Sequence, residues 1–230
     1  MSLPESLTGP PIAHRGLWRG GTRPENSLSA FDAACAAGYG IELDVRLTAD
    51  GEAVVYHDDS LERLTAESGL VEERTLDELK AITLLGGDHQ TIPSLSQALQ
   101  VIAGRSLVLV ELKTPPCQEG LLEAQVAELL TDYDGPNAVL SFNAAALGWL
   151  ARRHPAIPRG LNLDAAPGPD ELTLAEPDFL SINQKLSQIS EVQFWRTQTT
   201  PVIAWTVRSL DEWARLAGLV DNVVFEGFSP

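Results

Sequence analysis

Cysteine is scarce in this chain of 230 residues, which contains only Cys35 and Cys117. Two cysteines are too few for a disulfide framework or for a structural zinc site with cysteine ligands. We therefore expect each cysteine to be a small buried hydrophobic residue, as is usual in a reducing compartment.

Long apolar runs are also missing. No segment approaches the roughly 20 consecutive apolar residues that a membrane span requires. Residues 1–10 lack both the basic start and the apolar segment of a secretory signal. The sequence thus predicts no stable membrane insertion and a cytoplasmic location.

Basic residues are few relative to acidic ones, with 16 Lys and Arg against 32 Asp and Glu and a net charge of −16. A surface of this sign should repel nucleic acids and anionic membranes, so a nucleic-acid partner is not expected. A small phosphate ester remains a suitable partner, because a local cluster of cationic side chains can override the global field.

Short apolar segments alternate with helical patterns along the whole chain. Eight strands are predicted, at residues 11–14, 41–47, 106–112, 138–142, 159–163, 179–182, 202–206 and 223–225. The helices between them are a segment capped by Ser27 and ended by Gly38, followed by 75–84, 94–103, 120–132, 144–153, 169–175, 187–197 and 210–217.

This alternation predicts a parallel sheet, and eight units in this length fit a (β/α)8 TIM barrel formed by residues 1–230 as a single domain. The Asp50-Gly51 turn adds a small β-hairpin after the second strand, with residues 53–56 as its partner strand. An open doubly wound sheet is the alternative, but no GxGxxG motif follows the first strand.

Charged side chains lie near the ends of these strands, at alternate positions that point to the same face. Glu42 and Asp44 lie on one face of their strand, and Glu111 and Lys113 lie on one face of the next, because alternate residues of a strand point the same way. A TIM barrel collects the carboxyl ends of its strands at one mouth. The residues expected to meet there are His14, Arg15, Glu42, Asp44, His57, Glu111 and Lys113.

Three carboxylates in one mouth would repel one another, and a hard cation would relieve the repulsion. An all-oxygen ligand set suits Mg²⁺ or Ca²⁺ better than Zn²⁺, with Mn²⁺ as a further candidate. Each acidic residue taken alone is more typical of an exposed or ion-paired side chain, and Glu111 could simply pair with Lys113.

The order of the motifs resembles that of the glycerophosphodiester phosphodiesterase family over most of the chain, most strongly from residue 14 to residue 113. The motifs are His14-Arg15-Gly16, Pro24-Glu25-Asn26-Ser27, Ile41-Glu42-Leu43-Asp44-Val45, Val54-Val55-Tyr56-His57-Asp58, Ile92-Pro93-Ser94-Leu95, Val110-Glu111-Leu112-Lys113 and Ala204-Trp205-Thr206-Val207.

The resemblance implies a metal-dependent enzyme that hydrolyses small glycerophosphodiesters. It implies that Glu42, Asp44 and Glu111 bind one divalent cation and that His14 and His57 form the acid–base pair. Arg15 and Lys113 suit the phosphate, because arginine offers a bidentate fork and lysine a point charge. Supporting roles are suggested for Glu25, Asn26 and Trp205, although Asn26 could be only a helix cap.

Some points stay open at the level of sequence. The attacking oxygen is either the glycerol 2-hydroxyl or water, and the order in which the histidines act, the alcohol head group and the oligomeric state are undetermined. Arg208 stands where the family often has Asn, and residues 221–227 depart from the family pattern at the last strand. Competing interpretations are a lysophospholipase D-like or sphingomyelinase-like phosphodiesterase on the same barrel and a non-catalytic phosphodiester-binding protein.

Overall fold

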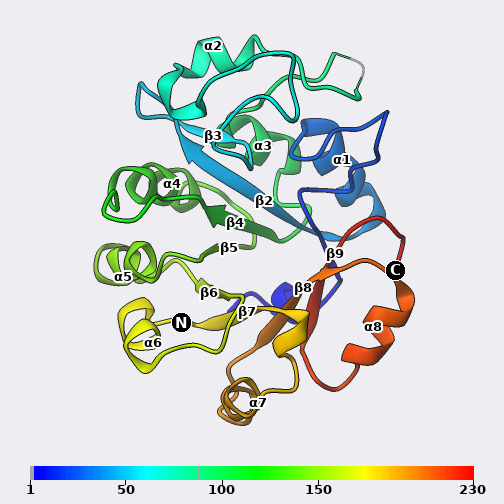
Figure 1. Ribbon diagram of the computed structural model, residues 1–230, viewed down its shortest axis with the longest axis vertical. Helices are drawn as coiled ribbons and strands as arrows, with labels where there is room; N and C mark the ends of the chain where they lie inside the picture. The colour runs from blue at the N-terminus through cyan, green and yellow to red at the C-terminus, as the bar shows by residue number, and fades with distance from the viewer. Residues whose placement is uncertain (1–2, 88) are drawn as a thin grey trace.

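Eight parallel strands form a closed barrel in the computed structural model, which describes residues 3–87 and 89–230 (Figure 1). The strands are β1 (Ile12–Ala13), β2 (Gly40–Leu47), β4 (Val108–Leu112), β5 (Asn137–Ser141), β6 (Arg159–Leu163), β7 (Phe179–Asn183), β8 (Val202–Val207) and β9 (Asn222–Phe225). They pair in the order β1-β9-β8-β7-β6-β5-β4-β2, and pairing of β1 with β2 closes the ring. The predicted (β/α)8 barrel is confirmed, and the open sheet is excluded.

Helices cover the outside of this ring (Figure 1). They are α1 (Leu28–Ala37), α3 (Leu95–Ile102), α4 (Leu121–Thr131), α5 (Ala144–Arg153), α6 (Pro169–Ala175), α7 (Ser190–Thr197) and α8 (Leu210–Leu216). The predicted caps of α1 are confirmed, because the Ser27 side chain accepts a hydrogen bond from the Ala30 N–H and Gly38 adopts φ of 76°. Two further 3-10 turns, η1 (Glu5–Thr8) and η3 (Gln184–Leu186), were not predicted.

Two apolar layers hold the barrel together. On β2, Ile41, Leu43 and Val45 point outward into the cluster that packs against the helices. A separate cluster fills the inside of the barrel and consists of Leu7, Ile12, Leu107, Leu109, Ala138, Leu140, Phe179, Ile203 and Val224. Since side chains alternate along a strand, the outward apolar set of β2 forces Glu42 and Asp44 to the inside, above this cluster.

The predicted hairpin is also present. β3 (Ala53–Val55) pairs antiparallel with β2, so that Val55 lies opposite Val45. It continues into a small cap with η2 (Val71–Glu73) and α2 (Leu76–Lys80), which has its own apolar cluster including Tyr56 and Leu61. This cap carries His57 to the mouth of the barrel.

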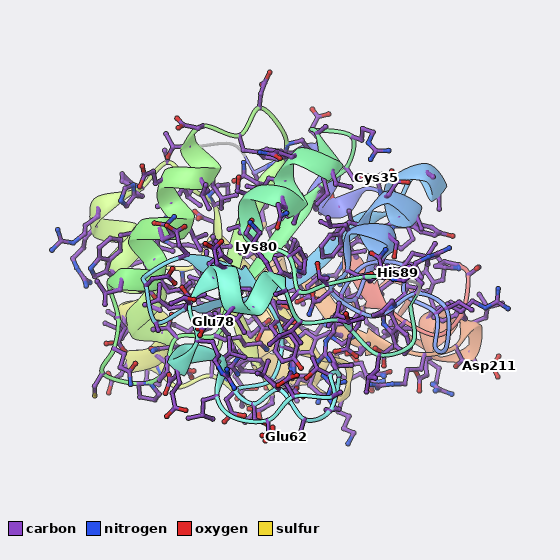
Figure 2. All side chains as sticks on the ribbon, turned by 90° about the horizontal axis from the view of Figure 1, so that it is seen from above. Cys35, Glu62, Glu78, Lys80, His89 and Asp211 are labelled. Carbon is purple, nitrogen blue, oxygen red and sulfur yellow. The ribbon has the colours of Figure 1, made fainter. Side chains whose placement is uncertain are left out.

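The helix predicted at residues 75–84 is shorter than expected and ends at Lys80. Beyond it, residues 82–84 pair with residues 90–92: the Leu84 N–H donates to the Gln90 carbonyl and the Ile92 N–H donates to the Ile82 carbonyl. This nonlocal pairing replaces the last helical turn. Figure 2 looks onto α2 and shows Glu78 and Lys80 along the short helix.

The expectation of two buried cysteines is wrong. Cys35 is partly buried on α1 (Figure 2), and Cys117 is exposed; both are free thiols. Cys117 follows Pro115 and Pro116 in the loop after β4, and two successive prolines cannot continue a buried strand. Among the described residues, every helix is too short or too polar to cross a lipid bilayer.

A glycine is required inside the barrel opposite Phe179. Gly160 pairs with Phe179 in the β6–β7 register, and a Cβ at this position would overlap the Phe179 ring. We expect Gly160→Ala to lower the free energy of unfolding by about 1–3 kcal/mol, because overpacking shifts a close-packed core. Gly20→Ala is the control, since a Cβ there meets no atom within 4 Å. Urea melts of both variants test this, and an unchanged midpoint for Gly160→Ala would contradict the packing.

Candidate active site

The predicted site residues surround a cavity of 240 Å³ at the carboxyl ends of the strands. Its lining residues are His14, Arg15, Glu42, His57, Glu111, Lys113, Leu140, Phe142, Asn162, Ser181, Trp205, Thr206, Arg208 and Val224. Of the other predicted residues, Asp44 and Asn26 are buried behind this lining, and Glu25 contacts Arg15. The structure therefore brings together all of the site residues that were predicted from the sequence.

Three carboxylates meet on adjacent strands. Asp44 of β2 lies opposite Glu111 of β4, and Glu42 stands two residues earlier on the same face of β2. One oxygen from each of the three lies within 4.8 Å of the others. Their exposed fractions are 3% for Glu42, 1% for Asp44 and 8% for Glu111. The sequence prediction that these side chains converge is confirmed.

Positive and polar side chains balance the negative charge of the Asp44 carboxylate. Lys113 Nζ lies 2.9 Å from its Oδ1, Arg15 Nε lies 3.3 Å from its Oδ2, and Asn26 Nδ2 donates to Oδ2 at 2.8 Å. Burial alone would raise the pKa of Asp44, but Lys113 and Arg15 outweigh it and hold the pKa below its usual range. Asn26 is therefore not the helix cap, a role that Ser27 fills; it contacts Asp44 instead.

Glu42 has the opposite electrostatic environment. Burial, followed by the charges of Asp44 and Glu111, raises its pKa well above the ordinary value. Its Oε2 accepts the Arg15 backbone N–H at 3.0 Å, but its Oε1 has no hydrogen-bond partner among the described residues. A buried carboxylate oxygen without a donor is costly, and a cation would satisfy it. The pKa of Glu111 is also raised, first by burial and partly offset by contact with Lys113.

This donor set fits a hard divalent cation. Its candidate ligand atoms are carboxylate oxygens carried by two paired strands, and Glu42 Oε1 has no hydrogen-bond partner in the part of the chain described. Lys113 and Arg15 neutralise part of the negative charge but leave the pKa of Glu42 raised.

His14 is held by a carboxylate that the sequence did not reveal as a site residue. Its Nδ1 lies 2.6 Å from Glu226 Oε2, and the other oxygen of Glu226 lies 2.8 Å from Arg208. The Nε2 atom of His14 lies 4.0 Å from Glu42 Oε2, on the side of the carboxylate cluster. Because Nδ1 faces Glu226, Nε2 is the ring nitrogen directed at the site.

His57 is held in the same manner. Its Nδ1 lies 2.6 Å from Asp58 Oδ1, and Arg63 Nε donates to Asp58 Oδ2 at 2.5 Å. Burial lowers the pKa of His57, although Asp44 opposes this shift. Arg63 also donates to Glu25 at 2.8 Å, and Glu25 accepts from Arg15 at 2.6 Å. Each histidine is thus oriented by a carboxylate that is itself bonded to an arginine.

The opposite wall of the cavity contains aromatic and neutral polar groups. Phe142 and Trp205 meet edge to face, with ring centroids 5.6 Å apart, and Asn162 and Ser181 lie on the neighbouring strands. Sequence reasoning named Trp205 but missed Asn162 and Ser181. A usable signal existed, because each is a polar residue in the inward phase of a predicted strand.

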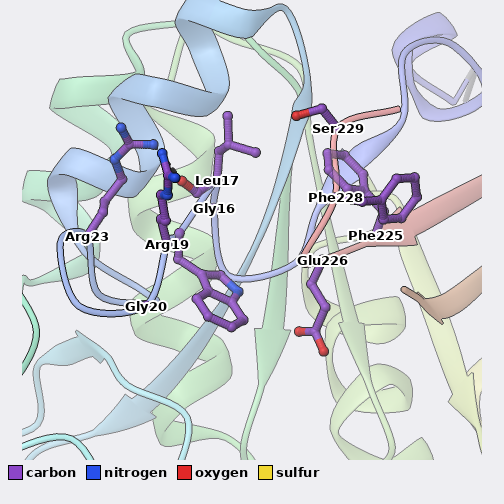
Figure 3. Close-up of a pocket in the computed structure, with 11 residues that line it drawn as sticks. Gly16, Leu17, Arg19, Gly20, Arg23, Phe225, Glu226, Phe228 and Ser229 are labelled. Atoms are coloured by element: carbon purple, nitrogen blue, oxygen red, sulfur yellow. Dashed lines mark hydrogen bonds between the residues drawn. The ribbon is translucent and has the colours of Figure 1, made fainter. Parts of the chain in front are cut away.

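A larger hollow of 560 Å³ adjoins the site between the loop after β1 and the carboxyl-terminal segment. In Figure 3, Arg19 and Arg23 lie on one side of it and Phe228 and Ser229 on the other. Glu226 borders this hollow, whereas Glu42, Asp44 and Glu111 do not line it. The chemistry therefore belongs to the smaller cavity.

Comparisons with known proteins agree with this geometry. The family model described as the glycerophosphoryl diester phosphodiesterase family matches residues 14–225. A glycerophosphodiester phosphodiesterase from Bacillus altitudinis is 35% identical over 69% of each chain, and the Bacillus subtilis protein YhdW is 32% identical over 93% of this chain and 92% of its own.

Solved structures show the same barrel. An Oleispira antarctica phosphodiesterase in complex with the product sn-glycerol-3-phosphate superposes with a TM-score of 0.85 at 31% identity, covering 94% of this chain and 91% of the other. A glycerophosphodiester phosphodiesterase from Parabacteroides distasonis gives a TM-score of 0.80 at 25% identity, covering 94% of both chains. Together with the motif order and the convergent site, these matches show that the chain belongs to the glycerophosphoryl diester phosphodiesterase family of phosphoric diester hydrolases.

Proposed function

We propose that this enzyme hydrolyses small glycerophosphodiesters to glycerol 3-phosphate and an alcohol, using two histidines and one divalent cation. The observation that carries the proposal is the buried carboxylate cluster, in which one Glu42 oxygen has no hydrogen-bond partner within residues 3–87 and 89–230, together with two imidazoles that carboxylates orient. The relative from Oleispira antarctica, whose structure holds sn-glycerol-3-phosphate as product, supports this choice of substrate.

The cation would be held by Glu42, Asp44 and Glu111, with Mg²⁺ or Ca²⁺ as the best candidates and Mn²⁺ as a third. When bound, it supplies positive charge that stabilises the developing negative charge on the phosphoryl oxygens. Arg15 and Lys113 border the same cavity and add positive charge on the phosphate side. Glu25 and Asn26 are positioning residues, since they bond Arg15 and Asp44.

His14 and His57 carry the proton transfers. One Nε2 takes a proton from the attacking oxygen, and the other gives a proton to the oxygen of the leaving alcohol. If the glycerol 2-hydroxyl attacks, a cyclic phosphate forms and water then opens it; if water attacks, the products form in one displacement. Trp205 and Phe142 form the wall against which the organic part of the substrate packs.

Replacing either histidine tests the acid–base pair. We expect His14→Ala and His57→Ala each to lower kcat by at least ~10²-fold, the usual contribution of one general acid or base. His154→Ala is the control, because His154 caps the end of α5 and stacks on Trp149 instead of lining the cavity. Steady-state kinetics with glycerophosphocholine measure the effect, and near-normal turnover by both variants would remove the assignment.

Glu42→Gln tests the cation site. We expect it to weaken divalent-cation affinity by at least ~10-fold, because loss of even a supporting residue around a metal site typically lowers metal affinity by that factor. The cation-free variant should be no less stable than the original protein, because burial and two neighbouring carboxylates oppose the charge on Glu42. Melting temperatures with and without Mg²⁺, Ca²⁺ or Mn²⁺ provide the readout, with exposed Glu62→Gln as control. Full activity of the original protein after EDTA treatment would count against the site.

Two diesters separate this function from its nearest rival. The small cavity of 240 Å³ leads us to expect hydrolysis of glycerophosphocholine but not of lysophosphatidylcholine, whose acyl chain it has no room to bury. Release of choline from each is the measurement. Preferential cleavage of the lipid would favour a lysophospholipase D-like enzyme, and binding without cleavage of either would favour a non-catalytic protein.

A further inference from the structure

The wall that faces the carboxylates and histidines contains two buried polar groups without partners. Asn162 Oδ1 and the indole N–H of Trp205 have no hydrogen-bond partner among the described residues, and both side chains line the 240 Å³ cavity. Asn162 is only 3% exposed. Leaving a buried acceptor or donor unpaired is costly, so each is expected to have a partner when the site is filled.

Three consecutive strands build this wall. Asn162 stands on β6, Ser181 on β7 and Trp205 on β8, and the β6–β7 register pairs Asn162 with Ser181. Residues paired across neighbouring strands point to the same face, so the Ser181 hydroxyl stands beside the Asn162 amide. In the ring order β1-β9-β8-β7-β6-β5-β4-β2, β6 lies opposite β1 and β7 lies opposite β2. The polar wall therefore faces His14 and Glu42 across the mouth.

The chemistry of the wall selects a neutral ligand. It offers the amide of Asn162, the indole N–H of Trp205 and the hydroxyl of Ser181, and these three side chains carry no formal charge. A phosphate would be better held by Arg15 and Lys113, which lie on the carboxylate side of the cavity. A ligand hydroxyl can satisfy either group, because its O–H can donate to Asn162 Oδ1 and its oxygen can accept from the Trp205 N–H.

We propose that Asn162, Ser181 and Trp205 form a subsite that recognises the terminal hydroxyl of the substrate's glycerol. This inference rests on the proposed function. The 2-hydroxyl is held close to the phosphoryl group by the short carbon chain, whereas the terminal hydroxyl lies one carbon further away and can extend to the opposite wall. Choline offers no second hydroxyl, so the glycerol end is the matching part of a substrate such as glycerophosphocholine.

A substrate pair isolates this contact. Glycerophosphocholine is compared with its analogue 2-hydroxypropyl phosphocholine, which keeps the 2-hydroxyl and the leaving group but lacks the terminal hydroxyl. Asn162→Leu replaces the amide by an apolar group with the same number of heavy atoms, and Trp205→Phe removes the indole N–H together with part of the ring; comparing the two substrates cancels the change in volume. Trp213→Phe on α8 is the matched control, because Trp213 packs against Phe228 outside the barrel.

We expect each site variant to lower kcat/KM for glycerophosphocholine by about 10- to 100-fold, the scale of a buried hydrogen bond left unmade. For the deoxy analogue the loss should be about 10-fold smaller, because the hydroxyl that these groups contact is absent, whereas any loss of Trp205 packing is common to both substrates. Trp213→Phe should affect neither substrate. Equal losses on both substrates, or no loss on either, would overturn the subsite.

Binding of products separates this inference from the proposed function. The original protein should bind sn-glycerol 3-phosphate more tightly than propane-1,2-diol 1-phosphate in calorimetry, and Asn162→Leu and Trp205→Phe should each reduce that preference. If the original protein cleaves neither diester, the proposed function fails while this comparison still decides the subsite. Equal affinity of the original protein for the two monophosphates would reject the glycerol subsite.

Discussion

Repulsion among three buried carboxylates is the constraint around which the rest of the site is arranged. Glu42, Asp44 and Glu111 converge because β2 and β4 pair in a fixed register inside a closed ring. Lys113 and Arg15 stabilise Asp44, yet the pKa of Glu42 remains raised by burial and by its acidic neighbours. The fold thus holds a concentration of negative charge whose repulsion a bound cation would relieve.

The same ring gives the cavity two chemically different sides. Most of the ionisable groups lie on or just after β1, β2, β3 and β4, whereas Asn162, Ser181 and Trp205 lie on β6, β7 and β8; Arg208, just after β8, pairs with Glu226. Below both sides, the apolar interior cluster closes the barrel, so that ligands enter from the mouth. A charged phosphate and a neutral polyol can therefore be recognised on opposite walls of one small space.

The barrel and most of its site residues could be predicted from sequence, because side chains alternate between the two faces of a strand with a fixed period. The alternation of residues 41–47 was enough to turn Glu42 and Asp44 inward. The contact of His14 with Glu226 was not predictable locally, since it joins positions 212 residues apart and depends on closure of the ring between β1 and β9. The helix expected at 75–84 failed for a similar reason, because pairing with residues 90–92 overrides local helical preference.

The two imidazoles rest on separate apolar cores. His14 follows a barrel strand whose Ile12 belongs to the interior cluster. His57 lies in the cap, directly after Tyr56, which belongs with Leu61 to a separate cluster. Loosening of the cap would therefore displace one imidazole and leave the other in place. Heat can then inactivate the enzyme before the barrel unfolds, because the cap cluster is smaller than the interior cluster of the barrel.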